Sequence, residues 1–181
     1  MTEIGDRMDA YIIIGDANAR KSSTMRCLTG CFNRSNRDIE IAPLAPNSTT
    51  SAKVIQVYAR VSSLQETDKG ILPWEFEQEV LDRVKSHGHL DAVAFCLWST
   101  AQVWHRPPGQ NGGTITCPPA SGYIQYLQNT TTNFNWRIAA VAVLGNPNIV
   151  ATYPNSVHFP RSPAQPINVT AQDVRRHFNW T

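Results

Sequence analysis

The sequence predicts an α/β fold, a three-layer sandwich in which helices cover both faces of a largely parallel sheet. Three mainly apolar runs, at residues 11–14, 92–98 and 137–144, fit strands that are buried on both faces. Helical patterns separate these runs, and strands that alternate with helices are typical of parallel sheets. The chain has 181 residues, of which 41% are hydrophobic, and it shows no internal repeat and no linker. We therefore expect one domain that spans residues 1–181.

The start of the chain predicts a strand, a loop and a helix in immediate succession. Residues 11–14 form an apolar, largely β-branched run that is too short for a helix and stops at Gly15. From Lys21 or Ser22 the apolar positions recur at roughly helical spacing, and Gly30 offers a stop. The chain therefore passes from strand to helix within a few residues.

The next segment predicts an edge strand, a second strand and a surface helix. Residues 38–41 alternate polar and apolar, residues 43–51 are typical of an exposed loop, and residues 54–61 form the next strand. Pro73 then begins a helix with acids in its first turns, bases in its last turn and Gly88 beyond it. Its apolar stripe consists of Phe76, Val80, Leu81 and Val84. This pattern is typical of a helix packed on a sheet.

The second half of the chain continues the alternation. Strands are expected at residues 92–98 and 137–144, and the second of these is the last strand of the prediction. Between them we expect a turn-rich loop at residues 105–113 and a helix near residues 119–129. A proline-studded surface stretch at residues 154–166 follows.

An amphipathic helix is predicted to end the chain. Thr170 is its expected N-cap, with Asp173 in the capping-box position, and Val174 and Phe178 lie on the apolar face.

The distribution of charge limits the function classes. A net charge of +2 is far from the strongly basic balance of a protein that binds nucleic acid by electrostatics alone. Residues 1–91 hold thirteen of the fourteen carboxylates, whereas residues 92–181 hold only Asp173 beside five arginines. Carboxylate chemistry must therefore come from the first half of the chain.

The apolar runs and the cysteines indicate a soluble, cytoplasmic protein with no membrane partner. No run approaches the ~20 residues that span a bilayer, and the first ten residues lack an apolar signal segment. The four cysteines are expected to be reduced thiols. Cys27 and Cys31 have helical spacing and could be combined with His87 and His89 into a zinc site, but we expect this pair to face the core.

The segment most informative about chemistry lies between the first strand and the first helix. It reads Gly15, Asp16, Ala17, Asn18, Ala19, Arg20, Lys21, Ser22 and Ser23. This segment resembles the phosphate-binding loop G-x-x-x-x-G-K-[ST] of the P-loop NTPase superfamily, in the same strand-loop-helix context. The resemblance implies that these nine residues bind a polyphosphate, that Lys21 neutralises its β- and γ-phosphates, and that Ser22 offers its hydroxyl to Mg²⁺. The implied cofactors are ATP or GTP with Mg²⁺.

Arg20 departs from the family pattern, which has glycine directly before the lysine. Glycine lets the backbone approach the phosphates and permits φ values that a long side chain resists, whereas Arg20 could add a second cation. In the alternative interpretation the segment is a plain turn in which Ser22 or Asn18 caps the helix. Two cations at a helix N-terminus oppose the helix dipole, and this favours an anion at the same place.

NTP hydrolysis or phosphoryl transfer also needs a carboxylate for Mg²⁺, normally at the end of a strand beside the loop strand. The strands at residues 92–98 and 137–144 end without an acid. The candidates are therefore Glu66 and Asp68, a few residues after the strand at residues 54–61, with solvated loop acids as the alternative.

Two further residues are catalytic candidates by chemical type. Gln65 could orient a water molecule, as GTPase glutamines do. Arg106 could be a lid or finger arginine that stabilises a transferring phosphoryl group, with an ordinary surface arginine as the alternative.

Three function classes follow from these observations. The first is Mg²⁺-dependent binding of a nucleoside triphosphate, with hydrolysis or phosphoryl transfer if the protein is an enzyme. The second is a non-catalytic regulatory or protein-interaction module with a degenerate loop. The third is a binder of single-stranded nucleic acid or another polyanion along the basic second half.

Overall fold

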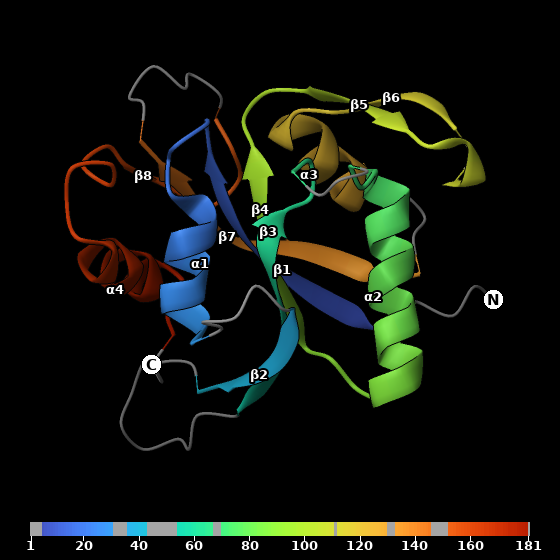
Figure 1. The fold of residues 1–181 in the computed structure, drawn as a ribbon. Helices are drawn as coiled ribbons and strands as arrows, with labels where there is room; N and C mark the ends of the chain where they lie inside the picture. Colours follow the sequence, from blue (N-terminus) through green and yellow to red (C-terminus); the bar gives the residue numbers. More distant parts are fainter. Residues whose placement is uncertain are drawn as a thin grey trace.

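The computed structural model describes residues 5–30, 36–42, 54–66, 70–110, 112–129, 133–145 and 152–180. Its centre is a six-stranded sheet with the strand order β2-β3-β4-β1-β7-β8 (Figure 1). The strands are β1 (Arg7–Gly15), β2 (Arg37–Ile41), β3 (Ile55–Ser63), β4 (Ala92–Trp98), β7 (Asn135–Leu144) and β8 (Ser156–Phe159). Every neighbouring pair is parallel except β2 with β3, so the sheet is largely parallel, as the sequence predicts.

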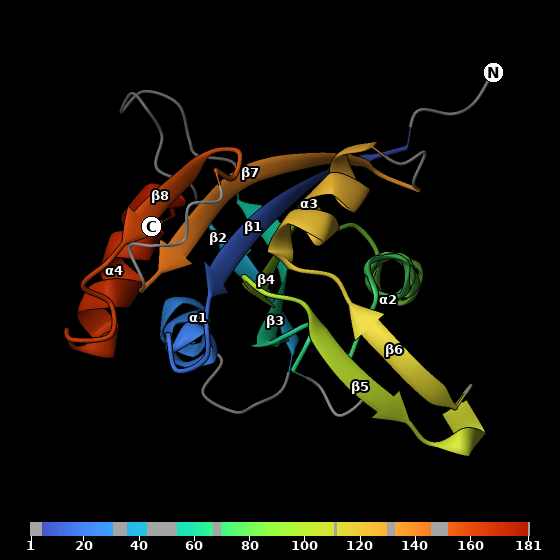
Figure 2. The same ribbon diagram turned by 90° about the horizontal axis from the view of Figure 1, so that it is seen from above.

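Helices cover both faces of this sheet. Helices α1 (Lys21–Thr29) and α4 (Ile167–His177) lie on one face, and α2 (Pro73–His87) and α3 (Ala120–Asn129) lie on the other (Figures 1 and 2). Alternate residues of β1 feed the two cores, with Ile13 in the cluster under α1 and α4 and Ile12 in the cluster under α2 and α3. The predicted three-layer α/β sandwich is therefore confirmed.

The carboxyl ends of four strands form one row. Gly15 of β1 pairs with Trp98 of β4 on one side and with Leu144 of β7 on the other, and Leu144 pairs with Phe159 of β8. The chain leaves β1 towards β2 and β3, whereas it leaves β7 towards β8 on the opposite side of the sheet. Neighbouring strands whose connections diverge in this way leave a crevice between their carboxyl ends, where open α/β sheets commonly bind ligands.

Several elements lie where the sequence places them. Strand β4 and the inner core of β7 match the apolar runs, β2 is an edge strand, and α1 begins at Lys21 and is followed by Gly30. Helix α2 begins at Pro73 and ends before Gly88. The predicted loop at residues 43–51 lies outside the described residues.

The predicted loop at residues 105–113 is wrong at its two ends, which belong to a hairpin. Strands β5 (Gln102–Arg106) and β6 (Gly113–Cys117) pair antiparallel around a short 3₁₀ turn, Pro108–Gln110, and form a separate sheet beside α2 (Figure 2). The hairpin is held by its inward side chains, because the Trp104 indole N–H donates to the Gln65 carbonyl at 2.6 Å. The outward residues are exposed and the inward ones are partly or fully buried, but Val103, an outward residue of β5, is apolar and obscures this alternation in the sequence.

Two predictions for the C-terminal region are also wrong. Strand β8 pairs with β7 inside the stretch expected to run over the surface, and its four residues are too few to show a pattern. Helix α4 begins at Ile167 with Pro166 as its N-cap, a full turn earlier than predicted. Thr170 is buried inside the helix, and its N–H already bonds the Pro166 carbonyl at 3.2 Å. The fixed φ of Pro166, −57°, prepares the helical turn without a side-chain cap.

Among the described residues, no helix combines the length and the apolar character that a membrane crossing needs.

Candidate functional site

The loop that follows β1 is tightly folded and conformationally strained. Asn18 and Arg20 both adopt left-handed backbone conformations, with φ of 62° and 63°. This region costs a residue with a side chain roughly 1–2 kcal/mol, and such strain is often found at functional sites. At Gly15 a Cβ atom would lie only 2.7 Å from the Cβ of Ala19 and 3.2 Å from the carbonyl oxygen of Leu144. The loop therefore curls directly over the ends of β1 and β7.

The N-terminus of α1 has no acceptor from its own flanking side chains. Its N-cap is Arg20, which makes no capping hydrogen bond, and its first turn contains no acid. The alternative in which Ser22 or Asn18 caps this helix is therefore wrong. The first-turn N–H groups and the positive end of the helix dipole are directed to the carboxyl edge of the sheet, which is an arrangement that attracts anions.

Lys21 is buried beside this helix end, with a residue exposure of 4%. Its Nζ donates to the carbonyl oxygen of Asp16 at 3.0 Å and lies 3.5 Å from Oε1 of Glu66. The same ammonium lies 4.5 Å from the centroid of the Trp98 ring, a cation–π distance. The fold thus brings together two predicted site residues from different loops, Lys21 and Glu66.

Asp16 ties the loop to the neighbouring strand. Its Oδ1 accepts a hydrogen bond from the hydroxyl of Ser99, the residue directly after β4. Burial, with a contribution from the Asp16 carboxylate, raises the pKa of the Tyr153 hydroxyl. Trp98 and Ser99 are contacts that the sequence analysis missed. The signal for them was present, because the residues that end a strand beside β1 must lie beside the loop.

Gln65 has a structural role in place of the expected water-orienting one. It is fully buried, and its Oε1 accepts the backbone N–H of Trp98 at 2.9 Å. Its Nε2 donates to the carbonyl oxygens of Trp98 at 3.2 Å and of Pro118 at 3.1 Å. Because its amide is engaged on both sides, Gln65 braces the end of β4 against the turn that carries Glu66.

The remaining predicted residues lie in different places. Arg106 makes two 2.7 Å bonds to the carboxylate of Glu75 and a 3.0 Å bond to the carbonyl of Gly70, so it anchors the hairpin to the start of α2. This ion pair holds the pKa of Glu75 below its usual value. Ser22 is the second residue of α1 and is half-buried. Asp68 lies outside the described residues.

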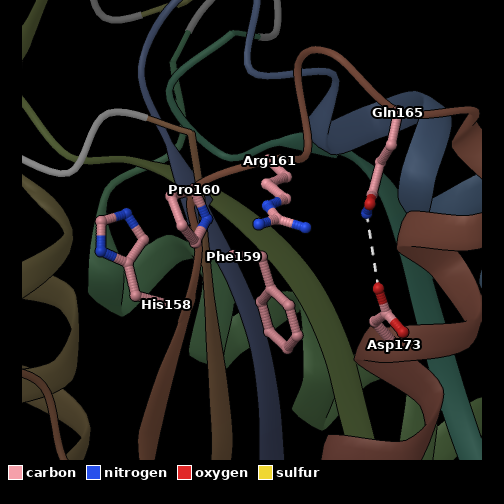
Figure 3. A pocket seen from close by; sticks show the side chains of 6 residues that line it. All are labelled: His158, Phe159, Pro160, Arg161, Gln165 and Asp173. Atoms are coloured by element: carbon pink, nitrogen blue, oxygen red, sulfur yellow. Dashed lines mark hydrogen bonds between the residues drawn. The ribbon is translucent and has the colours of Figure 1, made fainter.

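One cavity adjoins the loop, and a second lies beside the segment that joins β8 to α4. The first, of about 330 Å³, is lined by Asp16, Ala17, Asn18, Ala19, Leu144, Gly145 and Pro163, so it lies in the crevice between the ends of β1 and β7. The second, of about 270 Å³, is lined by His158, Phe159, Pro160, Arg161, Gln165 and Asp173 (Figure 3). The segment that joins β8 to α4 lines both cavities. Arg20 contacts this segment, because its Nη1 donates to the Gln165 carbonyl at 3.0 Å.

The second cavity combines an aromatic ring with polar groups of both kinds. The Arg161 guanidinium extends between Pro160 and the pair of Gln165 and Asp173, whose side chains are joined by a 3.4 Å hydrogen bond (Figure 3). The Phe159 ring lines the same space. The cavity therefore offers an apolar surface, a cation, an amide and a carboxylate.

The described residues contain no cluster of three His, Cys, Asp or Glu side chains able to hold a metal by themselves. Cys27 is a free thiol on α1, and its proposed zinc partner Cys31 lies outside the described residues. The oxygen donors that flank Lys21, namely the Ser22 hydroxyl and the Glu66 carboxylate, belong to the class of ligand that Mg²⁺ prefers when phosphates supply the other positions.

No family model, no curated protein and no solved structure matches this chain.

Proposed function

We propose that this protein binds a nucleoside triphosphate together with Mg²⁺ through residues 15–23. The single observation that carries the proposal is the convergence of an uncapped helix N-terminus and a buried lysine at one strand end. Residues of the loop after Gly15 line the 330 Å³ cavity on the side of β7, and the ammonium of Lys21, in the first turn of α1, lies against the same loop on the side of β4, beside Trp98. A polyphosphate supplies acceptor oxygens and negative charge to the N–H groups at this helix end, which the N-cap side chain leaves without a cap.

The second cavity supports a nucleoside as the rest of the ligand. The segment that joins β8 to α4 contributes residues to both cavities, so the second cavity is a neighbour of the first along the chain. Phe159 can stack on a base, while Arg161, Gln165 and Asp173 offer hydrogen-bond donors and acceptors to its edge. The proposal does not depend on which base is bound, so both ATP and GTP belong in the test.

Within this proposal Lys21 carries the charge that faces the phosphates, and Ser22 and Glu66 provide oxygen atoms for Mg²⁺. The ion would screen the phosphate charge and polarise the phosphoryl group. The free thiols of Cys27, Cys96 and Cys117 agree with action in the cytoplasm. If the protein turns its ligand over, the reaction is hydrolysis or phosphoryl transfer.

A second candidate is a non-catalytic module that uses the nucleotide as a regulatory ligand. The observation in its favour is that the strands on both sides of β1 end in Ser99 and Gly145, without an acid. The two candidates share the binding site and differ in turnover. Conversion of ATP or GTP to the diphosphate in the presence of Mg²⁺ separates them, with free phosphate released in hydrolysis and none in phosphoryl transfer.

The proposal is tested by thermal denaturation with ATP or GTP, with and without Mg²⁺. Ligand at 100 times its Kd stabilises by about 2.7 kcal/mol, which is roughly 5–10 °C in the melting temperature for a domain of this size. Lys21→Ala should abolish this shift, whereas the matched control Lys85→Ala, on the exposed end of α2, should retain it. If neither nucleotide shifts the wild-type protein under any of these conditions, the proposal is wrong.

A further inference from the structure

We infer that Glu66 makes the site selective for a nucleotide complexed with a divalent cation, and that it opposes binding of the metal-free nucleotide. This inference rests on the proposed function and specifies how the same site is regulated. It follows from the groups that already surround Lys21.

The charge of Lys21 is neutralised inside the protein. Its side chain is only 3% exposed, and Glu66 supplies the opposite charge at 3.5 Å. The carbonyl of Asp16 and the face of the Trp98 ring complete its surroundings. A phosphate that approaches Lys21 therefore meets a salt bridge and not a free cation.

The backbone of Glu66 is held in place, so the residue cannot withdraw from the site as a whole. Its N–H donates to the Ser63 carbonyl at 3.0 Å. The preceding residue, Gln65, is fixed by its side-chain bonds to Trp98 and Pro118 and by the indole of Trp104 on its carbonyl. The side chain of Glu66 is 31% exposed, and its carboxylate is tied to the site by the 3.5 Å ion pair with Lys21.

A metal-free nucleotide would consequently place phosphate oxygens beside the carboxylate of Glu66. The negative charges of the phosphate and of the Glu66 carboxylate would repel strongly there, because the site partly excludes water. A divalent cation removes this repulsion. The Glu66 carboxylate then binds the cation in place of Lys21, and the Lys21 ammonium can bind the phosphates. Ser22, the next residue in the chain, carries a hydroxyl that is a second oxygen donor of the kind that Mg²⁺ prefers.

The experiment measures the Kd of ATP and GTP by isothermal titration, in Mg²⁺ and in EDTA, for four proteins. They are the wild type, Glu66→Gln, Glu66→Asp and the matched control Glu40→Gln, an acid on edge strand β2 that bonds only to the Gln56 side chain among the described contacts. For the wild type and Glu40→Gln we expect Mg²⁺ to tighten binding at least tenfold. For Glu66→Gln the metal-free nucleotide should bind at least fivefold tighter than to the wild type, and the effect of Mg²⁺ should fall below threefold. Glu66→Asp keeps the charge and should keep the Mg²⁺ dependence.

The outcomes separate this inference from the function on which it rests. If Glu66→Gln binds nucleotide with the same ratio of Kd values in EDTA and Mg²⁺ as the wild type, the role of Glu66 is refuted while nucleotide binding stands. The same conclusion follows if Glu66→Asp behaves like Glu66→Gln, since charge is then not the cause. If no protein binds either nucleotide in either buffer, the proposed function and this inference both fail. Circular dichroism spectra that superimpose on the wild type establish that each variant is folded.

Discussion

The left-handed conformation of Arg20 predicts that glycine at this position stabilises the fold relative to alanine. Arg20 has φ of 63° and ψ of 26°, and its guanidinium bonds the Gln165 carbonyl. Both Arg20→Gly and Arg20→Ala remove that bond, so the comparison between the two variants isolates the backbone. A left-handed conformation costs alanine roughly 1–2 kcal/mol and glycine almost nothing.

The unfolded state opposes part of this difference. Glycine gains about 0.5–1 kcal/mol more conformational entropy on unfolding than alanine does. The net expectation is that Arg20→Gly is more stable than Arg20→Ala by about 0.5–1 kcal/mol. For a protein of this size that corresponds to roughly 1–4 °C in melting temperature.

The assay is urea denaturation of both variants, monitored by circular dichroism. The free energies of unfolding are compared, provided that the two variants have the same m-value. The matched control is Thr29, the last residue of α1, where Thr29→Ala should be more stable than Thr29→Gly because the backbone there is helical. If Arg20→Ala is as stable as Arg20→Gly or more stable, the left-handed conformation does not carry the cost we assign to it, and the argument for strain in this loop fails.

Three further predictions concern the supports of the site. Gln65→Ala should lower the free energy of unfolding by about 2–4 kcal/mol in urea titrations, because it leaves the N–H of Trp98 buried and unpaired. A loss below about 0.5 kcal/mol would contradict the bracing role. Burial raises the pKa of the Cys96 thiol from 9.0 to about 12, so its contribution to stability is complete below pH 9 and is lost as the pH rises towards 12. Cys96→Ala should therefore make stability fall less steeply between pH 9 and 10 than in the wild type, and equal slopes would refute this assignment. Arg106 lowers the pKa of Glu75, so the ion pair stabilises the fold fully at pH values above the usual carboxyl pKa of 4.5 and less as the pH falls below it. Arg106→Gln should therefore reduce the free energy of unfolding more at pH 7 than at pH 3, measured by urea titration.

The sequence predicts the buried part of this fold better than its surface. Strand β4 has the predicted bounds because seven consecutive residues are apolar or nearly so, and a run of this kind has few alternatives. The hairpin β5–β6 could not be predicted in the same way, since it is anchored by contacts with residues distant in the chain, such as the Trp104 indole on Gln65 and Arg106 on Glu75. Helix α4 begins earlier than predicted because Pro166 prepares its first turn, whereas Thr170 only matches a capping pattern.

The candidate site was partly predictable for a similar reason. A local motif identifies Lys21, because strand, loop and helix are consecutive in the chain. The meeting of Lys21 with Glu66 depends on the order of strands in the sheet, which the sequence does not state. The position of Gln65 shows the converse. Its residue type suits catalysis, but its side-chain amide is already hydrogen-bonded to the backbone of Trp98 and Pro118.

The two ends of the loop motif are subject to different evolutionary constraints. At Gly15 space is the limit, because a Cβ atom would lie 2.7 Å from the Cβ of Ala19 and 3.2 Å from the Leu144 carbonyl oxygen, so that both neighbours would have to shift. At Arg20 the limit is conformational, and a cost of roughly 1–2 kcal/mol can be offset by gains at distant positions. Descendants of the same ancestor should therefore keep glycine at position 15 while position 20 drifts among glycine, asparagine and longer side chains. A search for such sequences should require glycine at position 15 and allow any residue at position 20, where the P-loop pattern has its second glycine.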